Sequence, residues 1–270
     1  MAEFEQFIKE RTYLTNVSSR TIEWYRQSFK WLDNPNPTEA DLKEFVIRMR
    51  EGGLKPSSCN NRIRAVNAYL KWAGSSLKVQ KLKEGQRVLP TFDAADIQKI
   101  VRYKPKTATR IRLQVLLLTL ADTGTRIDEA LSLKWHDVDF DNLLLTVTGK
   151  GDKQRKIPFS FELRRFLWRY KPRFKFDLVF PTSTGNKWDR RVVLRDVKLL
   201  CRSLSITFPE RTLHAFRHTF ATNYLRKGGS VFHLQKVLGH SSLDMSRKYA
   251  HLSTNDLSAV HQKVSLLGSR

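Results

Sequence analysis

The segment 213–252 holds the densest set of chemically informative side chains in the sequence. His214 and Arg217 are three positions apart, which places both on one face of a predicted helix. A Gly-Gly pair ends that helix, a short apolar stretch leads to His240, and Tyr249 follows nine residues later. The segment therefore predicts helices separated by a glycine break, with three kinds of polar side chain along them.

Arginine, histidine and tyrosine together suit phosphoryl transfer without a metal ion. A guanidinium offers a planar fork of donors to phosphate oxygens, imidazole exchanges a proton near neutral pH, and an assisted phenol can act as a nucleophile. Taken singly, a histidine or tyrosine in a basic protein is most often a packing or surface residue. His214 and His218 also have the spacing of a zinc helix. However, Ala215 stands where the metalloprotease pattern needs Glu, so we expect no metal and no other cofactor.

The charge balance indicates a polyanionic partner. Lys and Arg number 49 against 26 Asp and Glu, a net charge of +23. Such an excess favours contacts with nucleic-acid phosphates, although an RNA-coating protein would share it. With 270 residues, 40% of them hydrophobic, the chain can build two modest domains or one large one and is not a disordered basic tail.

The remaining compositional signals indicate a protein of the cytoplasm, associated with the nucleoid if the host is prokaryotic. Cys59 and Cys201 are far apart and have no CxxC neighbour, which is typical of reduced thiols. The charged N-terminus has no apolar core of a signal peptide. The longest apolar run, 115–121, is too short to span a bilayer, so we expect no membrane association.

Residues 1–73 predict a unit of four helices. Thr38 and Asp41 resemble a capping box at the start of one of them. The last helix has an apolar stripe and an opposite face rich in Asn and Arg. That face is either simply solvated or lies against DNA, and it comprises Asn60, Asn61, Arg62, Arg64 and Asn67.

Residues 74–89 lose periodicity and carry Lys78, Lys81 and Lys83, so we expect a linker that is either solubilising or follows a phosphate backbone. The pattern restarts at Pro90 and predicts a second domain over 90–270. Helices are expected at 93–101, 109–121, 160–170 and 188–203, and strands at 142–148, 153–159 and 178–180. The fold class is therefore mainly α with a small antiparallel sheet (α+β).

Two further polar positions precede the segment 213–252. Arg126 and Glu129 sit i, i+3 at a helix start, which is either a weak local ion contact or a preorganised phosphate clamp. Lys150 lies in the tight turn between the first two predicted strands. That turn is not a P-loop, because Leu144 replaces the first Gly and Gly151 replaces the Ser or Thr.

The C-terminal tail predicts one more helix, from about 254 to 267. Ser253 and Asp256 resemble a capping box, and an apolar stripe follows. Such a stripe packs either on the chain's own core or on a neighbouring subunit.

Six polar residues, in this order, resemble the pattern of the tyrosine recombinase (phage integrase) family: Arg126, Lys150, His214, Arg217, His240 and Tyr249. The local contexts TGTRIDEALSL, TVTGKGDKQRKIP, LHAFRHTFAT and LGHSSLDMSRKYAHL resemble the family's boxes. Thr125, Asp128 and Phe216 depart mildly from it, and none of them removes a reacting group. The resemblance covers nearly the whole chain and is nearest to the compact Xer-like type, since the four N-terminal helices leave no room for an arm-binding domain.

The resemblance implies a helical core-binding (SAM-like) domain over 1–73 and a catalytic domain over 90–270 that cleaves and rejoins DNA strands. Tyr249 would attack the scissile phosphate and form a 3′-phosphotyrosyl link without metal or ATP. Arg126, Arg217 and His240 would stabilise the developing charge, Lys150 would protonate the leaving oxygen, and His214 would contact the phosphate or help take the tyrosine proton. Glu129 would orient the site.

Recombination further implies double-stranded DNA with a specific site, a homo-tetramer on two duplexes and subunit exchange by the tail helix. Two alternatives remain at this stage. One is a type IB topoisomerase-like nicking-closing enzyme, and the other is a DNA-binding regulator without catalysis. The target sequence, the need for accessory proteins, and the choice between integration, excision, dimer resolution and transposition stay open.

Overall fold

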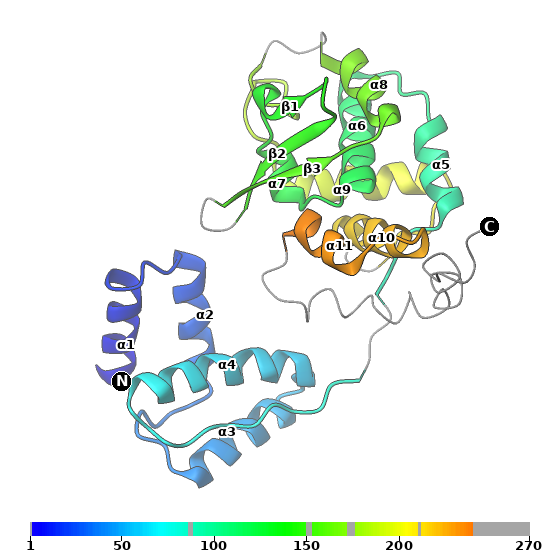
Figure 1. Ribbon diagram of the computed structural model, residues 1–270. Coiled ribbons are helices and arrows are strands. Elements are labelled where there is room, and N and C mark those ends of the chain that lie inside the picture. Colours follow the sequence, from blue (N-terminus) through cyan, green and yellow to red (C-terminus); the bar gives the residue numbers. More distant parts are fainter. Residues whose placement is uncertain (1, 86–88, 150–152, 172–175, 210–211, 240–270) are drawn as a thin grey trace, which may run out of the picture. The chain divides into compact units, whose positions relative to one another are not determined.

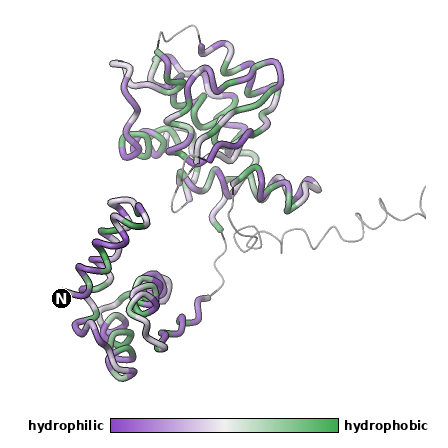
Figure 2. Tube along the Cα trace, turned by 60° about the vertical axis from the view of Figure 1, so that its left-hand side comes forward, coloured by the Kyte–Doolittle hydropathy of each residue, from purple (hydrophilic) through white to green (hydrophobic). Residues whose placement is uncertain are grey.

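The computed structural model describes residues 2–85, 89–149, 153–171, 176–209 and 212–239. The chain divides into two compact units, Met1–Arg87 and Val88–Arg270. Each unit has its own hydrophobic core. Hydrophobic and hydrophilic residues alternate along the helices of both units, as expected when one face of a helix is buried (Figure 2).

The first unit contains the four expected helices (Figure 1): α1 (Ala2–Tyr13), α2 (Ser19–Phe29), α3 (Glu39–Glu51) and α4 (Pro56–Trp72). The capping box at α3 is confirmed. The Thr38 side chain accepts a hydrogen bond from the Asp41 amide at 3.2 Å, and the Asp41 carboxylate accepts one from the Thr38 amide at 2.8 Å. The core of this unit is largely aromatic, with stacked and edge-on contacts among Phe4, Phe7, Tyr25, Phe29 and Tyr69.

Two asparagines of α4, both candidates for DNA contact, hold the segment that follows the helix. The Asn67 amide group donates to the Val79 carbonyl and accepts from the Val79 amide, each at 2.9 Å. The Asn60 amide group makes the same pair with Leu82, at 2.9 and 2.7 Å, and also donates to Glu84. Both side chains therefore bind the backbone of the following segment.

These bonds also shorten the expected linker. Residues 77–82 lie along α4, and Val79 is buried in the first core. Lys78, Lys81 and Lys83 alternate with the anchored residues and are exposed. The segment that was expected to be a linker over 74–89 is thus tied to the first unit as far as residue 84.

Asn67→Ala is expected to release this segment. Two part-buried hydrogen bonds disappear, at about 0.5–1.5 kcal/mol each, and the Val79 amide should exchange with solvent as fast as an exposed loop amide. Hydrogen exchange of Val79 measures the effect. Asn61→Ala is the matched control, because Asn61 is exposed and bonds only Arg64 among the described residues. A Val79 amide that stays protected in Asn67→Ala would contradict the role assigned to the side chain.

The second unit is mixed. Its helices are α5 (Ala94–Arg102), α6 (Ala108–Thr123), α7 (Ile127–Leu131), the 3-10 turn η1 (Trp135–Asp137), α8 (Phe161–Tyr170), α9 (Arg190–Ser203), α10 (Thr212–Arg226) and α11 (Val231–Leu238). Strands β1 (Val138–Asp139), β2 (Leu144–Thr148) and β3 (Gln154–Pro158) form an antiparallel sheet in the order β1-β2-β3. Leu145 pairs with Val138 on one side and with Ile157 on the other. The predicted fold class, mainly α with a small antiparallel sheet, is confirmed.

Helix α6 is the centre of this unit. It packs against α5, α7, α8, α9 and α10, and ten of its residues are buried, on all of its sides. A helix that is buried all round must be in the core. Its C-terminal end therefore has a well-defined position, and the Gly124 turn and Arg126 follow directly from it.

The third expected strand is wrong. Residues 178–180 form one bridge, between Leu178 and Lys134, and the third strand of the sheet is β1. Val179 and Phe180 are fully buried. The apolar run therefore indicated burial in the core and not a strand. The Val179 amide donates to the Leu133 carbonyl at 2.8 Å, but this bond is not part of a β-sheet.

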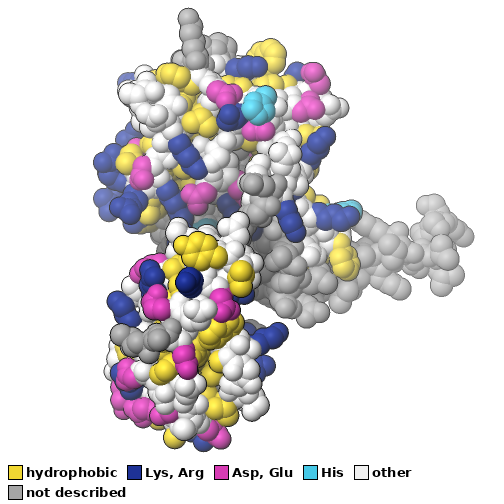
Figure 3. All heavy atoms as spheres, turned by 90° about the vertical axis from the view of Figure 1, so that its left-hand side faces the viewer, with side chains coloured by type: hydrophobic (Ala, Val, Ile, Leu, Met, Phe, Trp, Pro, Cys, Tyr) yellow, Lys and Arg dark blue, Asp and Glu magenta, His cyan; other side chains and the backbone are white. Residues whose placement is uncertain are grey.

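The surface of both units carries many Lys and Arg side chains, interspersed with Asp and Glu (Figure 3). Among the described residues, no helix is both long and apolar enough to cross a membrane.

Candidate active site

The site is built at the turn between α6 and α7. Gly124 ends α6 in the left-handed conformation with a φ of 62°, which glycine adopts without steric cost. The Thr123 hydroxyl donates to the Thr119 carbonyl at 2.6 Å and lies 3.1 Å from the Thr125 hydroxyl. These bonds hold the turn that delivers Arg126 to the start of α7.

Arg126 is held by Glu129, as the i, i+3 spacing allowed. The backbone amide of Arg126 donates to Glu129 Oε2 at 2.8 Å, and its Nη1 donates to Oε1 at 2.8 Å. The Arg126 side chain is 41% exposed while that of Glu129 is 6% exposed. The carboxylate is thus a buried anchor, and the guanidinium it orients faces outward where an anionic ligand can reach it.

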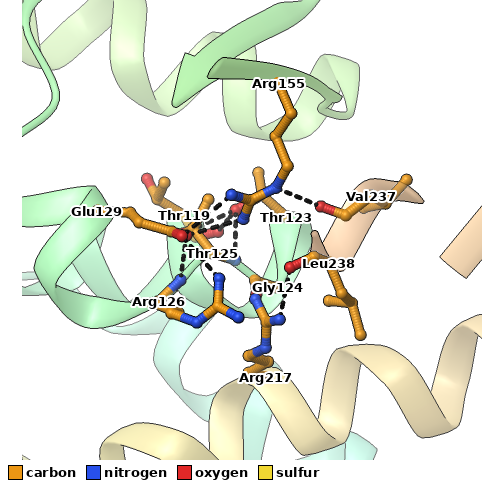
Figure 4. A network of polar contacts seen from close by, with 10 residues as sticks. All are labelled: Thr119, Thr123, Gly124, Thr125, Arg126, Glu129, Arg155, Arg217, Val237 and Leu238. Carbon is orange, nitrogen blue, oxygen red and sulfur yellow. Dashed lines mark hydrogen bonds and ion pairs between the residues drawn. The ribbon is translucent and has the colours of Figure 1, made fainter. Parts of the chain in front are cut away.

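Arg155 on β3 is the second anchor of Glu129 and was not singled out from the sequence (Figure 4). Its Nη1 and Nη2 donate to the two carboxylate oxygens at 3.0 and 2.8 Å, and its Nε donates to the Val237 carbonyl at 2.9 Å. The only sequence signal was its place in TVTGKGDKQRKIP, three positions after the hairpin turn 149–152. A run of charged residues after a hairpin does not distinguish a buried cation from exposed ones.

The two arginines keep Glu129 ionised. Burial alone would raise the pKa of Glu129. The hydrogen bonds from Arg155 and from the Arg126 backbone, with the Arg155 charge, outweigh burial and hold the pKa below its ordinary value. The lowered pKa favours the ionised carboxylate, which is the form that pairs with the Arg126 guanidinium.

Arg217 reaches the same turn from α10. It is 6% exposed, and its Nη1 and Nη2 donate to the Gly124 carbonyl at 2.8 Å and to the Leu238 carbonyl at 2.6 Å. These bonds join α10, the α6–α7 turn and the C-terminal end of α11 (Figure 4). The structure therefore brings Arg126, Glu129 and Arg217 together, as the predicted site requires.

His214 lies one turn before Arg217 on α10 and is exposed. Its Nε2 is 3.3 Å from Arg190 Nη2, and Arg190 Nη1 is 3.6 Å from the Asp128 carboxylate on α7. Arg190 and His214 line an open pocket with Leu194 and Leu213. An exposed imidazole beside the same short helix as Arg126 can meet a ligand that the arginine binds.

Lys150, His240 and Tyr249 lie outside the described residues, as does the tail helix expected at about 254–267. The residues that precede two of them are described. Gly149 precedes Lys150, and its amide bonds the Lys153 carbonyl at 2.9 Å across the hairpin. Gly239 precedes His240 and ends α11 with a φ of 63°.

The candidate DNA-binding residues of the first unit divide into two groups. Asn60 and Asn67 are occupied by the segment 77–84, as described above. Arg64 is exposed, donates to Asn61 at 3.0 Å and lies over the Trp24 ring. Arg62 is half-buried and donates to the Ser58 carbonyl. The cationic candidates that lie exposed are Arg64, Lys78, Lys81 and Lys83.

Within the part of the chain that the structure describes, no three His, Cys, Asp or Glu side chains gather as metal ligands.

The chain is similar to known proteins over most of its length. Residues 90–256 match the model of the phage integrase family. The tyrosine recombinase XerA of Pyrococcus horikoshii is 30% identical over 94% of this chain and 90% of its own length. The tyrosine recombinase XerC of Xanthomonas campestris is 28% identical over 95% of this chain and 86% of its own length.

Solved structures share the fold. The Tn1549 transposon integrase in complex with circular intermediate DNA aligns with a TM-score of 0.79 at 22% identity and covers 97% of this chain and 99% of that chain. The XerH site-specific recombinase bound to its difH substrate aligns with a TM-score of 0.72 at 21% identity, over 98% of this chain and 84% of that chain.

Proposed function

The chain belongs to the phage integrase family of tyrosine recombinases, and on this premise we propose that it is a site-specific DNA recombinase that uses Tyr249 as its nucleophile. The observation that carries the proposal is the turn at 124–126. There one arginine is oriented outward by a buried carboxylate and a second is anchored on the turn itself. Two guanidinium groups near one point suit a phosphodiester whose negative charge grows during reaction.

In the proposed cleavage step, the Tyr249 hydroxyl oxygen bonds to the scissile phosphorus as the bond to the 5′-oxygen breaks. The products are a 3′-phosphotyrosyl link and a free 5′-hydroxyl. His214 takes the tyrosine proton, and Lys150 gives a proton to the leaving oxygen. Arg126, Arg217 and a hydrogen bond from His240 stabilise the charge on the non-bridging oxygens. In the reverse step, a 5′-hydroxyl from another strand displaces the tyrosine, so that the number of phosphodiester bonds is conserved.

The assembly follows from the reaction. Exchange between two duplexes requires cleavage of four strands, so a homo-tetramer on two double-stranded DNA sites is part of the proposal. The first unit and the catalytic unit would hold the duplex, with Arg62, Arg64, Lys78, Lys81 and Lys83 as candidate phosphate contacts. The expected tail helix would dock on a neighbouring subunit.

The two alternatives are not favoured. A type IB topoisomerase-like enzyme would share the tyrosine chemistry, and a regulator would share the fold. The relatives that match nearly the whole chain are instead named as recombinases. The two arginines at the α6–α7 turn, Arg126 and Arg217, support a catalytic protein.

Covalent trapping tests the proposal. The full chain is incubated, without added metal, with nicked suicide duplexes from its own genomic neighbourhood, and denaturing gels compare wild type with Tyr249→Phe. An adduct in wild type that vanishes in the variant is the expected result. An adduct that survives in Tyr249→Phe would place the nucleophile elsewhere. Tight binding to its own site with no adduct would leave a DNA-binding protein without this activity.

A further inference from the structure

One guanidinium, that of Arg155, joins three segments of the catalytic unit (Figure 4). It extends from β3, bonds both oxygens of Glu129 on α7, and bonds the Val237 carbonyl near the end of α11. Its partners are 26 and 82 residues away in sequence. A side chain with this many long-range bonds fixes the relative position of the segments that it links.

The same guanidinium lies beside the residues that precede two proposed catalytic groups. A Cβ placed on Gly149 would be 3.6 Å from Arg155 Nη1, and one placed on Gly239 would be 3.0 Å from Arg155 Cδ and Nε. Gly149 precedes Lys150, and Gly239 precedes His240. Arg155 is therefore in contact with both chain segments where they leave the described core.

The burial and the paired charge of Arg155 indicate that its side chain is held in one position. Its side chain is 15% exposed, against 41% for Arg126. Its charge is compensated by Glu129, which has a lowered pKa. A lysine would preserve the charge but could not form the parallel pair of bonds to the carboxylate together with a third bond to Val237.

We propose that Arg155 is a positioning residue for strand cleavage, an inference that rests on the proposed recombinase function. Through Glu129 it sets the orientation of the Arg126 guanidinium. Through β3 and α11 it holds the hairpin that leads to Lys150 and the helix end that leads to His240. Arg155 itself does not touch the DNA. Its loss misplaces several groups at once, and catalysis is sensitive to misplacement of about 1 Å, which costs about 10²-fold in rate.

The test is single-turnover formation of the covalent adduct on the suicide duplex by Arg155→Lys in the full chain. We expect the cleavage rate to fall by about 10²-fold while the equilibrium affinity for the duplex is unchanged. The matched control is Arg165→Lys, because Arg165 also pairs with a glutamate, Glu162 at 3.2 Å, but lies exposed on α8. The control should cleave at the wild-type rate. Equal cleavage by wild type and Arg155→Lys would overturn the inference.

A second substrate separates positioning from general damage. A duplex with a methylphosphonate at the scissile position has no negative charge there, so charge stabilisation by Arg126 contributes less to the cleavage rate. If Arg155 acts through Arg126, the rate deficits of Arg155→Lys and Arg126→Gln should both shrink on this substrate. An undiminished Arg155→Lys deficit on the methylphosphonate duplex would show that Arg155 does not act through Arg126 and would contradict that part of the proposal.

Glu129→Gln provides an independent variant if Arg155→Lys folds poorly. It removes the carboxylate that both arginines share but preserves the side chain's size. In the double variant Arg155→Lys/Glu129→Gln, the two losses of cleavage rate should not add, because each substitution breaks the same link between Arg155 and Glu129. Additive deficits would overturn the inference. Failure of the proposed function looks different, since wild type itself would then form no adduct.

Discussion

Arg217→Gln is expected to reduce both the stability of the catalytic unit and the rate of adduct formation, whereas Arg126→Gln reduces only the rate. Arg217 is buried and bonds two backbone carbonyls, those of Gly124 and Leu238. A shorter, neutral side chain leaves these carbonyls without their donor, at about 1–3 kcal/mol each. It also removes the proposed donor to the reacting phosphate, and loss of such a donor costs about 10²–10³-fold in rate.

Arg126 offers the contrast. Its ion pair with Glu129 involves a side chain that is 41% exposed, and such pairs contribute about 0–1 kcal/mol. In Arg126→Gln, Glu129 keeps its two bonds from Arg155 and the one from the backbone amide. Chemical denaturation and single-turnover cleavage, measured on both variants, check the prediction. Equal losses of unfolding free energy in the two variants would contradict the distinction between Arg217, which stabilises the fold, and Arg126, which does not.

Gly124→Ala is expected to destabilise the catalytic unit strongly. The left-handed backbone costs an alanine about 1–2 kcal/mol. The added Cβ would also lie 2.4 Å from Phe220 Cδ1 and 3.0 Å from Leu238 Cδ2, and relief of that overlap costs a further 1–3 kcal/mol or so, about the usual range for overpacking. Because the Gly124 carbonyl accepts from Arg217, the resulting shift should also slow cleavage.

The matched control for this prediction is Gly228→Ala. Gly228 has a φ of 81°, yet a Cβ there would meet nothing within 4 Å. Gly228→Ala is therefore destabilised by the left-handed backbone alone, without steric overlap. Urea denaturation of the two full-length variants separates the terms. If both variants lost the same free energy of unfolding, the close packing of Phe220 against the turn would not be the cause.

Much of the local structure was predictable because its causes are local. The four N-terminal helices follow from apolar spacing over a few residues, and the Thr38–Asp41 capping box is a contact between positions three apart. The strands at 144–148 and 154–158 follow from a β-rich run and the glycine turn between them. The same holds for Arg126 and Glu129, whose pairing needs only one helical turn.

Contacts between residues far apart in the sequence were not predictable in this way. Asn60 and Asn67 were candidates for DNA contact because their helix face is polar, yet they bind backbone 22 and 12 residues further on. The apolar run 178–180 had the composition of a strand, yet it fills the core. A side chain's type shows what bonds it can form, but not which distant segment will supply the partner.

The sequence alone was sufficient for the fold class and for the family resemblance, because both depend on residue types and short spacings. The tertiary structure alone decided that Arg217 is buried on the Gly124 turn, 93 residues away, and that Arg155 ties Glu129 to the end of α11. These contacts depend on how α6, α10, α11 and β3 pack around one core. Long-range packing is a collective property of the folded chain, and no local pattern encodes it.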